Sequence, residues 1–222
     1  QDSVPARPFS QVVAVVKGEF GVHPDELFDS FTRSPIASAS LAQVHRARTK
    51  AGDDVAVKIQ YPGIDRILET DLRNVAILVR LLARLEKNFD FRVLVRELNK
   101  DMPRELDFEL EGRSSERVAR DLAHRKDILI PKVFWETTRR RVLTTEFIEA
   151  TKISDTEALL AEGIDPNQVA LIMTEAYCEQ ILVHGFFRAD PHPGNLFVLP
   201  GPVVVFLDFG LSKELPEKFR QN

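Results

Sequence analysis

The sequence contains a single cysteine, Cys178, which excludes an internal disulfide framework and disfavours a metal site built from thiolates. Its neighbours Ile172, Ala176, Ile181 and Leu182 recur at helical spacing. Free cysteine behaves as a small hydrophobe in such a setting. We therefore expect Cys178 to be a buried structural thiol rather than a reactive one.

Long apolar runs and blocks of basic charge are also missing. No run reaches the roughly 18–20 apolar residues that cross a bilayer. The formal charge of −4 comes from 34 acidic and 30 basic residues, with no basic block, so we expect no nucleic-acid partner. The segment Gln1–Pro8 resembles neither a signal nor a transit peptide, and because residue 1 is not Met we expect a piece of a longer protein.

The hydrophobic pattern changes along the chain from mixed strands and helices to mainly helices. Asp165 and Pro166 are typical of a helix start, whereas Pro103 should break a long amphipathic stretch. The expected elements are two short helices between Phe9 and Phe31, strands at Ala42–Arg48 and Val55–Gln60, helices at Ile64–Phe89 and Arg92–Leu122, strands at Ile128–Phe134 and Arg141–Phe147, a helix at Asp165–Val183, and a strand-and-loop segment at Phe186–Leu211.

This order of elements predicts a single α+β domain of two lobes over residues 1–222. The mixed lobe covers about residues 1–146 and the mostly helical lobe about residues 147–222. A short connector near Glu146–Thr151 joins the two, as a hinge would.

The segment Phe187–Asn195 carries the strongest chemical signal. Two prolines and a glycine within four residues make a rigid irregular loop that can hold an acid in place. Asp190 and Asn195 are five residues apart, the spacing at which a kinase places the aspartate that accepts the acceptor's proton and the asparagine that ligates a metal. Asp208 opens an Asp-Phe-Gly tripeptide at the end of an apolar strand and suits Mg²⁺. The alternative is a proline-rich turn and an unrelated strand end, which the joint spacing disfavours.

A lysine on an otherwise apolar strand is the second candidate site residue, expected to act together with the Asp190 loop. Lys58 shares one strand face with Ala56, so its side chain should project from a small sheet toward a cleft. An unpaired buried lysine is costly, so it requires an anionic partner. In kinases the corresponding lysine holds the nucleotide phosphates and pairs with a helix glutamate. An exposed strand lysine is the alternative, and the downstream loop disfavours it.

No G-x-G-x-x-G precedes Lys58, and the segment Ile36–His45 stands in its place. Its alanines and serines let the backbone approach phosphates but lack the freedom of glycine at positive φ. We therefore expect a stiffer loop than that of an ordinary protein kinase. The expected nucleotide contacts in this loop are Ala37, Ser38, Ala39 and Ser40.

Three segments together identify a family resemblance. Ala37–Ala47 resembles an alanine-rich nucleotide loop, Glu105–Glu111 resembles an E-x-D motif followed by a helix glutamate, and Ala189–Asn195 resembles a catalytic loop almost letter for letter. These are motifs of the UbiB/aarF-domain family of atypical kinase-like proteins, which includes the ADCK and coenzyme Q8 proteins. The resemblance implies a two-lobed, protein-kinase-like α+β fold, with helices inserted in the small mixed lobe and a truncated, mostly helical second lobe.

Carried over by position, the resemblance implies a site for ATP or ADP and Mg²⁺. Lys58 would pair with Glu111 and the phosphates, Asp190 would take the place of the catalytic base, and Asn195 and Asp208 would ligate Mg²⁺. The further residues implied are Glu146, Ile148 and His192 as nucleotide contacts, and Glu105 and Asp107 as a motif that controls the cleft.

Alternatives and departures accompany these assignments. The acids of Glu105–Glu111 are also the pattern of a solvated helix face. His192 is equally suited to brace its own loop with a hydrogen bond. The family's K-x-G-Q motif is absent from this sequence, and Arg188 stands where the family often has histidine.

The resemblance implies an ATP- and Mg²⁺-dependent kinase or ATPase that supports isoprenoid-quinone or membrane-lipid metabolism. Its expected partners are a nucleotide, a lipid or quinone-precursor ligand, and a membrane surface or protein. Its expected location is at a membrane in bacteria, or in mitochondria or plastids in eukaryotes. The alternatives are a nucleotide-binding regulatory module with little turnover and a small-molecule kinase of the aminoglycoside-phosphotransferase type.

Overall fold

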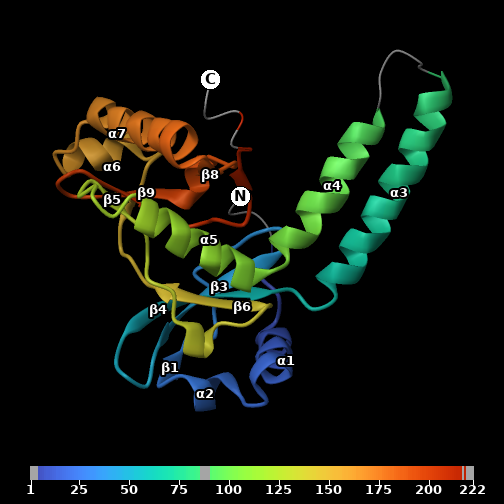
Figure 1. The fold of residues 1–222 in the computed structure, drawn as a ribbon. Coiled ribbons are helices and arrows are strands. Elements are labelled where there is room, and N and C mark those ends of the chain that lie inside the picture. The colour runs from blue at the N-terminus through green and yellow to red at the C-terminus, as the bar shows by residue number, and fades with distance from the viewer. Residues whose placement is uncertain (1–4, 86–90, 217, 219–222) are drawn as a thin grey trace.

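The computed structural model describes residues 5–85, 91–216 and 218 of the chain. An N-terminal sheet with two helices lies on one side, and a second part of helices and short strands lies on the other (Figure 1). A pair of long helices projects away from both. The two-lobed α+β arrangement that the sequence predicts is therefore present.

The first part is built on a five-stranded antiparallel sheet of order β1-β3-β4-β6, with β2 also paired to β3. Its central strands β3 and β4 pair along their whole length, through a turn in which Gly52 has a φ of 98°. Only glycine adopts that backbone region without strain. The three longer strands match the expected ones to within a residue or so. The strands are β1 Ser30–Phe31, β2 Ala37–Ser38, β3 Ala42–Arg48, β4 Asp54–Gln60 and β6 Val142–Glu146.

Helix α1, Phe9–Phe20, covers one face of this sheet and is followed by the short α2, Pro24–Leu27. The face of α1 that carries Val12 and Val16 packs in one cluster with the odd-numbered positions of β4. Since successive strand residues point to opposite faces, Lys58 is left on the other face of the sheet.

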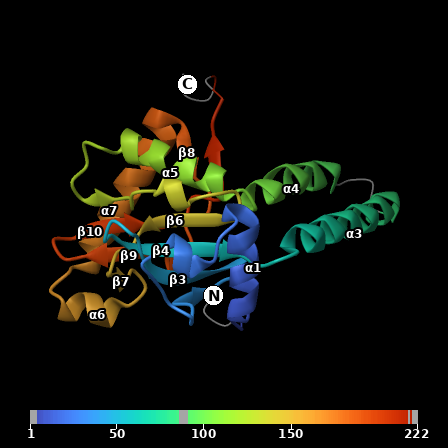
Figure 2. The ribbon, with the colours of Figure 1, turned by 90° about the horizontal axis from the view of Figure 1, so that it is seen from below.

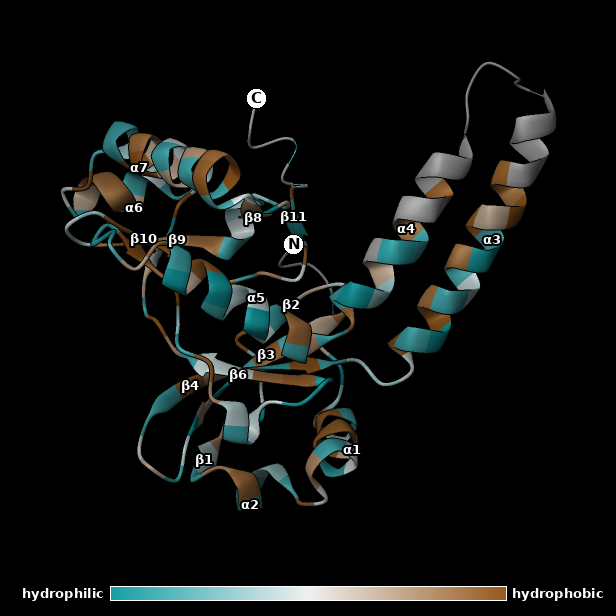
Figure 3. Cartoon of the chain, in the orientation of Figure 1, coloured by the Kyte–Doolittle hydropathy of each residue, from teal (hydrophilic) through white to brown (hydrophobic). Residues whose placement is uncertain are grey.

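Two long helices, α3 (Ile64–Leu85) and α4 (Phe91–Glu105), lie side by side and project from the body (Figures 1 and 2). The hydropathy colouring shows apolar bands along α3 (Figure 3). The apolar residues of α3 that lie exposed include Ile67, Ile77 and Leu78. Residues 86–90, which the sequence assigns to the end of the first helix, lie outside the described part.

The stretch expected to break or kink at Pro103 is interrupted, but a few residues after that proline rather than at it. Pro103 lies inside the last turns of α4, and the helix ends only at Glu105. The break occurs because Asp107 starts the next helix, α5 (Phe108–Asp121), with its side chain accepting a hydrogen bond from the Leu110 N–H. A new N-cap therefore decides the boundary, since it satisfies donors that a continuous helix would bond internally.

The second part combines short strands with two helices. A four-stranded sheet has the order β5-β10-β9-β7, and β8 pairs with β11 in a separate two-stranded sheet. The elements are β5 Ile128–Leu129, β7 Thr151–Lys152, α6 Thr156–Ala161, α7 Pro166–Glu179, the π-helical turn η2 Gln180–His184, β8 Phe186–Arg188, the 3-10 turn η3 Pro193–Asn195, β9 Leu196–Leu199, β10 Val203–Phe206 and β11 Ser212–Glu214. The 3-10 turn η1, Trp135–Thr137, lies beside β6 of the first part.

Three local expectations need correction here. The segment expected as one strand at Ile128–Phe134 is split at Pro131, which has no N–H to give to a ladder: its first two residues form β5, and Val133 pairs with Thr145 of β6 as an isolated bridge. The helix expected at Asp165–Val183 is α-helical only to Glu179 and then widens into η2. Cys178 is exposed, not buried, because it lies two residues from the inward-facing Ala176 and therefore on the outer side of α7.

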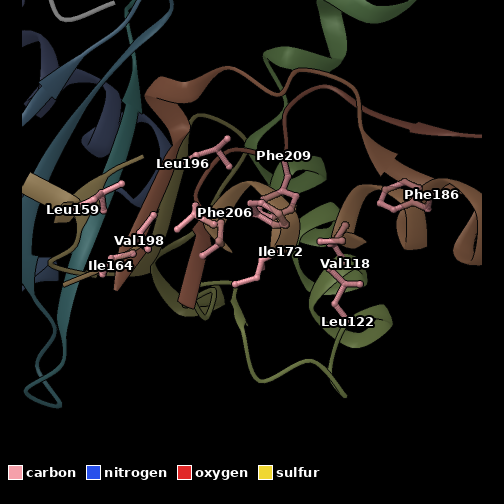
Figure 4. Packing of buried hydrophobic residues seen from close by; sticks show 13 residues of the cluster. Val118, Leu122, Leu159, Ile164, Ile172, Phe186, Leu196, Val198, Phe206 and Phe209 are labelled. Carbon is pink, nitrogen blue, oxygen red and sulfur yellow. The ribbon is translucent and has the colours of Figure 1, made fainter. Parts of the chain in front are cut away.

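The core of the second part also includes the end of α5. Val118 and Leu122 pack with Ile172, Phe206 and Phe209 in one buried cluster (Figure 4). Helix α5 thus contributes to the packing of the second part while it stands next to the sheet of the first. Among the described helices, none is long and apolar enough to cross a membrane.

The N-cap at Asp107 gives a direct test of the α4–α5 boundary. Asp107→Ala is expected to lower the free energy of unfolding by about 1 kcal/mol, because the Leu110 N–H loses its acceptor. Asp107→Asn keeps a capping oxygen and should retain most of the stability. Denaturant unfolding of the three proteins measures the difference, and equal losses for both variants would contradict a capping role.

Candidate nucleotide and metal site

The site centres on an ion pair between the sheet and α5. The Lys58 Nζ donates to Glu111 Oε1 at 2.8 Å and to Oε2 at 2.9 Å, across 53 residues of sequence. The Glu111 side chain is only 3% exposed, and that of Lys58 is 24% exposed. The pairing implied by the family resemblance is therefore present.

The surroundings of this pair are apolar on one side and acidic on the other. The ring of Phe108 lies 4.9 Å from the Lys58 Nζ, in cation–π range. Burial alone would lower the pKa of Lys58, but Asp208 and Glu111 raise it above its ordinary value. Burial raises the pKa of Glu111, although Lys58 opposes that rise. Lys58 is thus held as a cation between Glu111 and Asp208.

Asp208 is the second acid at Lys58. Its Oδ2 lies 3.5 Å from the Lys58 Nζ and accepts from the Asn195 amide at 3.3 Å, while its Oδ1 accepts from the Gly210 N–H at 3.0 Å. Burial alone would raise the pKa of Asp208, but Lys58 and the Gly210 N–H lower it below its ordinary value. The carboxylate is therefore ionised and fixed in direction.

The donor set around Asp208 fits Mg²⁺. Mg²⁺ prefers oxygen ligands and usually takes one or two protein groups, with phosphates and water in the remaining positions. Asp208 and Asn195 meet that requirement with a carboxylate and an amide side by side. Among the described residues no three His, Cys, Asp or Glu side chains gather as an independent metal site.

Asp190 stands in an exposed position just after β8, and the chain around it is tied down. The Ala189 N–H donates to the Leu211 carbonyl at 2.7 Å, which links this loop to the segment after Asp208. His192 Nδ1 accepts from the Gly194 N–H at 3.0 Å. The loop-bracing role considered for His192 is thus observed, while its contact with phosphate stays a prediction.

The loop that replaces the glycine-rich motif lies beside Lys58. Ala37 faces Val44 across the β2–β3 pair, and Val44 faces Lys58 across the β3–β4 pair. Directly opposed residues share a face of the sheet, so the three lie in one row. Ala39 and Ser40 follow in an exposed turn closed by an Ala39 N–H bond to the Ala42 carbonyl at 2.8 Å.

The connector residues lie at the end of β6, away from the row of Ala37, Val44 and Lys58, because Glu146 pairs with Val55 of β4. Glu146 ends β6 and is exposed, and its backbone N–H donates to the Lys132 carbonyl at 2.9 Å. Ile148 is half-buried just beyond it. Leu143, three residues before Glu146, lies opposite Lys58 and lines a small pocket with Glu111 and Phe209.

The acids of the Glu105–Glu111 motif have different roles. Glu111 is buried, Asp107 caps α5, and Glu109 lies toward solvent, 3.9 Å from Arg113. The solvated-face alternative is therefore wrong for Glu111 and correct for Glu109. Glu105 ends α4 and is half-buried.

Two polar groups close to the Asp190 loop were not predicted as site residues, although the sequence marks Arg188 as a departure from the family pattern. Arg188 is 3% exposed, and the Tyr177 hydroxyl is also buried. Their signal in the sequence is weak, since Tyr177 lies on a helix and Arg188 follows two phenylalanines in a short apolar strand.

A strand lysine paired with a helix glutamate, beside an Asp-Phe-Gly carboxylate on a two-lobed fold, defines a protein of the kinase-like class. The family model for the ABC1 atypical kinase-like domain matches residues 1–222. The chain therefore belongs to the ABC1 atypical kinase-like family, as the UbiB/aarF resemblance predicted.

Relatives agree with this family and this fold. The chain is 40% identical to "Probable serine/threonine-protein kinase abkD" of Dictyostelium discoideum, over 100% of this chain and 33% of that protein. It is 37% identical to "AarF domain-containing protein kinase 1" of Xenopus laevis, over 97% of this chain and 42% of that protein. The solved Rv3197–erythromycin complex from Mycobacterium tuberculosis superposes with a TM-score of 0.81 at 32% identity, covering 96% of this chain and 54% of that one. The chain thus spans less than half the length of the Dictyostelium and Xenopus relatives.

The ion pair predicts a pH-dependent stability defect. Lys58→Ala is expected to lower the free energy of unfolding by about 3 kcal/mol near neutral pH, because it leaves a buried carboxylate without its partner. The pKa of Glu111 in the folded variant then lies well above its unfolded value, so stability falls as pH rises from the unfolded pKa toward the folded one. Chemical denaturation between acidic and mildly alkaline pH measures this slope.

Two controls separate this effect from lost packing. The double variant with Glu111→Gln added to Lys58→Ala has no carboxylate at position 111 and should lose the part of the slope that comes from Glu111. Arg46→Ala removes an exposed partner of Asp54 and should cost less than about 1 kcal/mol. A Lys58→Ala defect that is the same at every pH would contradict the assignment.

Proposed function

We propose that this chain binds ATP with Mg²⁺ and acts as an atypical kinase or ATPase. The carrying observation is the Asp208 carboxylate, which lies between Lys58 and Asn195 and is held ionised. Mg²⁺ at this carboxylate would neutralise phosphate charge, and the protein's part is then positioning and electrostatic stabilisation. Family membership and the kinase names of the relatives support this class of activity.

Each site residue then has a defined task. Lys58, steadied by Glu111, holds the phosphates, and Asp208 and Asn195 hold Mg²⁺. The exposed Asp190 accepts the proton of an acceptor hydroxyl or of water. The row of Ala37, Val44 and Lys58, the turn at Ser38 to Ser40, and the connector residues Glu146 and Ile148 surround the nucleotide.

Nucleotide binding tests the role of Asp208. ATP should raise the Tm of the wild type more with Mg²⁺ than without it, and Asp208→Asn should lose at least about tenfold in Mg²⁺-dependent affinity, the equivalent of about 1.4 kcal/mol. Asp65→Asn, an exposed change at the start of α3, is the matched control. Unchanged Mg²⁺ dependence in Asp208→Asn would remove the metal assignment.

Phosphate release from the same samples separates turnover from a regulatory role. Release that depends on Asp190 and Mg²⁺ supports a kinase or ATPase. Mg²⁺-dependent binding without release supports instead a nucleotide-sensing module, for which the glycine-free loop is the structural argument.

The acceptor that we propose is a lipid-related small molecule, such as an isoprenoid-quinone precursor, met at a membrane surface. Family membership alone supports this part. Phosphate release should rise severalfold when vesicles that contain an isoprenoid phenol are added, compared with vesicles without it. No response to either preparation would remove the lipid part of the proposal and leave the nucleotide site intact.

A further inference from the structure

Arg188 is a buried cation whose charge lowers the pKa of Asp208. It is 3% exposed, and both terminal nitrogens of its guanidinium lack a hydrogen-bond partner within residues 5–85, 91–216 and 218. Its backbone N–H donates to the Gln180 side-chain oxygen at 3.4 Å. Burial of a guanidinium without an acceptor is strongly unfavourable. Its position therefore suits an anion that arrives from elsewhere.

Tyr177 adds an unused donor to the same neighbourhood. Its hydroxyl is buried and has no partner in the described part of the chain. Burial raises the pKa of that hydroxyl, the Arg188 charge lowers it and the Asp190 charge raises it, so Tyr177 lies within electrostatic reach of both charges. A guanidinium fork and a phenol hydroxyl together are suited to an oxyanion.

Three carboxylates on the elements around β8 already have other partners, while the exposed Asp190 lies two residues from Arg188. Glu214 accepts from Arg117 at 2.8 Å, Asp208 is held by Lys58 and Asn195, and Glu179 lies within ion-pair distance of Arg125.

Ser212 lies directly opposite Arg188. Strands β8 and β11 are antiparallel, with Ser212 paired to Arg188 and Glu214 paired to Phe186. Opposed residues share a face, with their Cβ atoms about 4.5–5.5 Å apart. Arg117 contacts both members of the second pair, bonding Glu214 and covering the Phe186 ring at 4.1 Å. The face shared by Ser212 and Arg188 is therefore the inward one, toward α5.

We propose that Ser212 is a phosphorylation site and that Arg188 and Tyr177 receive its phosphate. A phosphoserine carries about −1.5 to −2 charges and three acceptor oxygens, which match the unused guanidinium and hydroxyl donors. The proposal is independent of catalysis by this chain, because any protein kinase with ATP supplies the group.

The modification is an ordinary phosphoryl transfer. The Ser212 Oγ forms a bond to the γ-phosphorus of ATP, and the bond from that phosphorus to the bridging oxygen breaks. ADP leaves with the electron pair, and the hydroxyl proton passes to the base of the modifying kinase. The hydroxyl gives up its present bond to the Phe209 carbonyl, 2.8 Å away.

The phosphate would fix the two loops of the candidate site to each other. Arg188 lies two residues before Asp190, and Ser212 lies four residues after Asp208. Between them runs the bond from the Ala189 N–H to the Leu211 carbonyl, at 2.7 Å. A bridge from Ser212 to Arg188 adds a second tie across the same pair of strands, so phosphorylation acts as a regulatory clamp.

The test uses the chain with phosphoserine incorporated at position 212. Its Tm should exceed that of the unmodified chain by about 4 °C, the scale of one or two charge-assisted hydrogen bonds in a domain of this size. Arg188→Gln should abolish the increase, and Tyr177→Phe should reduce it. Phosphoserine at the neighbouring position 213, compared with Lys213→Ser, is the matched control and should give no Arg188-dependent increase.

Two further measurements keep the proposal open to refutation if Arg188→Gln folds poorly. Phosphorus NMR of the phosphoserine-212 chain should give a second phosphate pKa below the ordinary value of about 6, and an unshifted value would overturn the proposal. Inorganic phosphate added to Ser212→Ala tests a free anion as the source. Arg188-dependent stabilisation there, with none from phosphoserine 212, would overturn the modification site and leave a binding site for free phosphate.

Discussion

The ion pair between Lys58 and Glu111 is the constraint on which the arrangement of the two parts depends. Lys58 belongs to the sheet of the first part, and Glu111 lies in the first turn of α5, whose other end packs in the core of the second part. Asp208 reaches the same lysine from the second part. One ammonium therefore joins three segments that are remote in sequence, and the low exposure of Glu111 makes the loss of any partner costly.

The sequence predicts much of this site because its signals are local. The odd-numbered apolar positions of β4 leave Lys58 on the opposite face, and rigid loop chemistry marks Asp190 and Asn195. The pairing of Lys58 with Glu111, in contrast, has no local signal in the sequence. Acids at Glu105, Asp107, Glu109 and Glu111 look alike in a helical pattern, and only the family resemblance selects the one that the fold buries.

The features that sequence patterns missed depend on competition between local backbone preferences and tertiary packing. Pro103 is a strong helix breaker in isolation, but near the end of α4 few hydrogen bonds remain for it to remove. The N-cap of Asp107 therefore sets the boundary. Cys178 has apolar neighbours, but the inward side of α7 is set by what packs on it. The burial of Arg188 follows from strand pairing, which no single-strand pattern contains.

The projecting pair α3 and α4 has a mechanical consequence. Its two ends are attached to the two halves of the ion pair, since β4 leads into α3 shortly after Lys58 and α4 leads into α5 shortly before Glu111. With 22 residues, α3 is about 33 Å long at a rise of 1.5 Å per residue. A force applied at the far end of this pair would therefore act on the distance between the Lys58 ammonium and the Glu111 carboxylate at the candidate site.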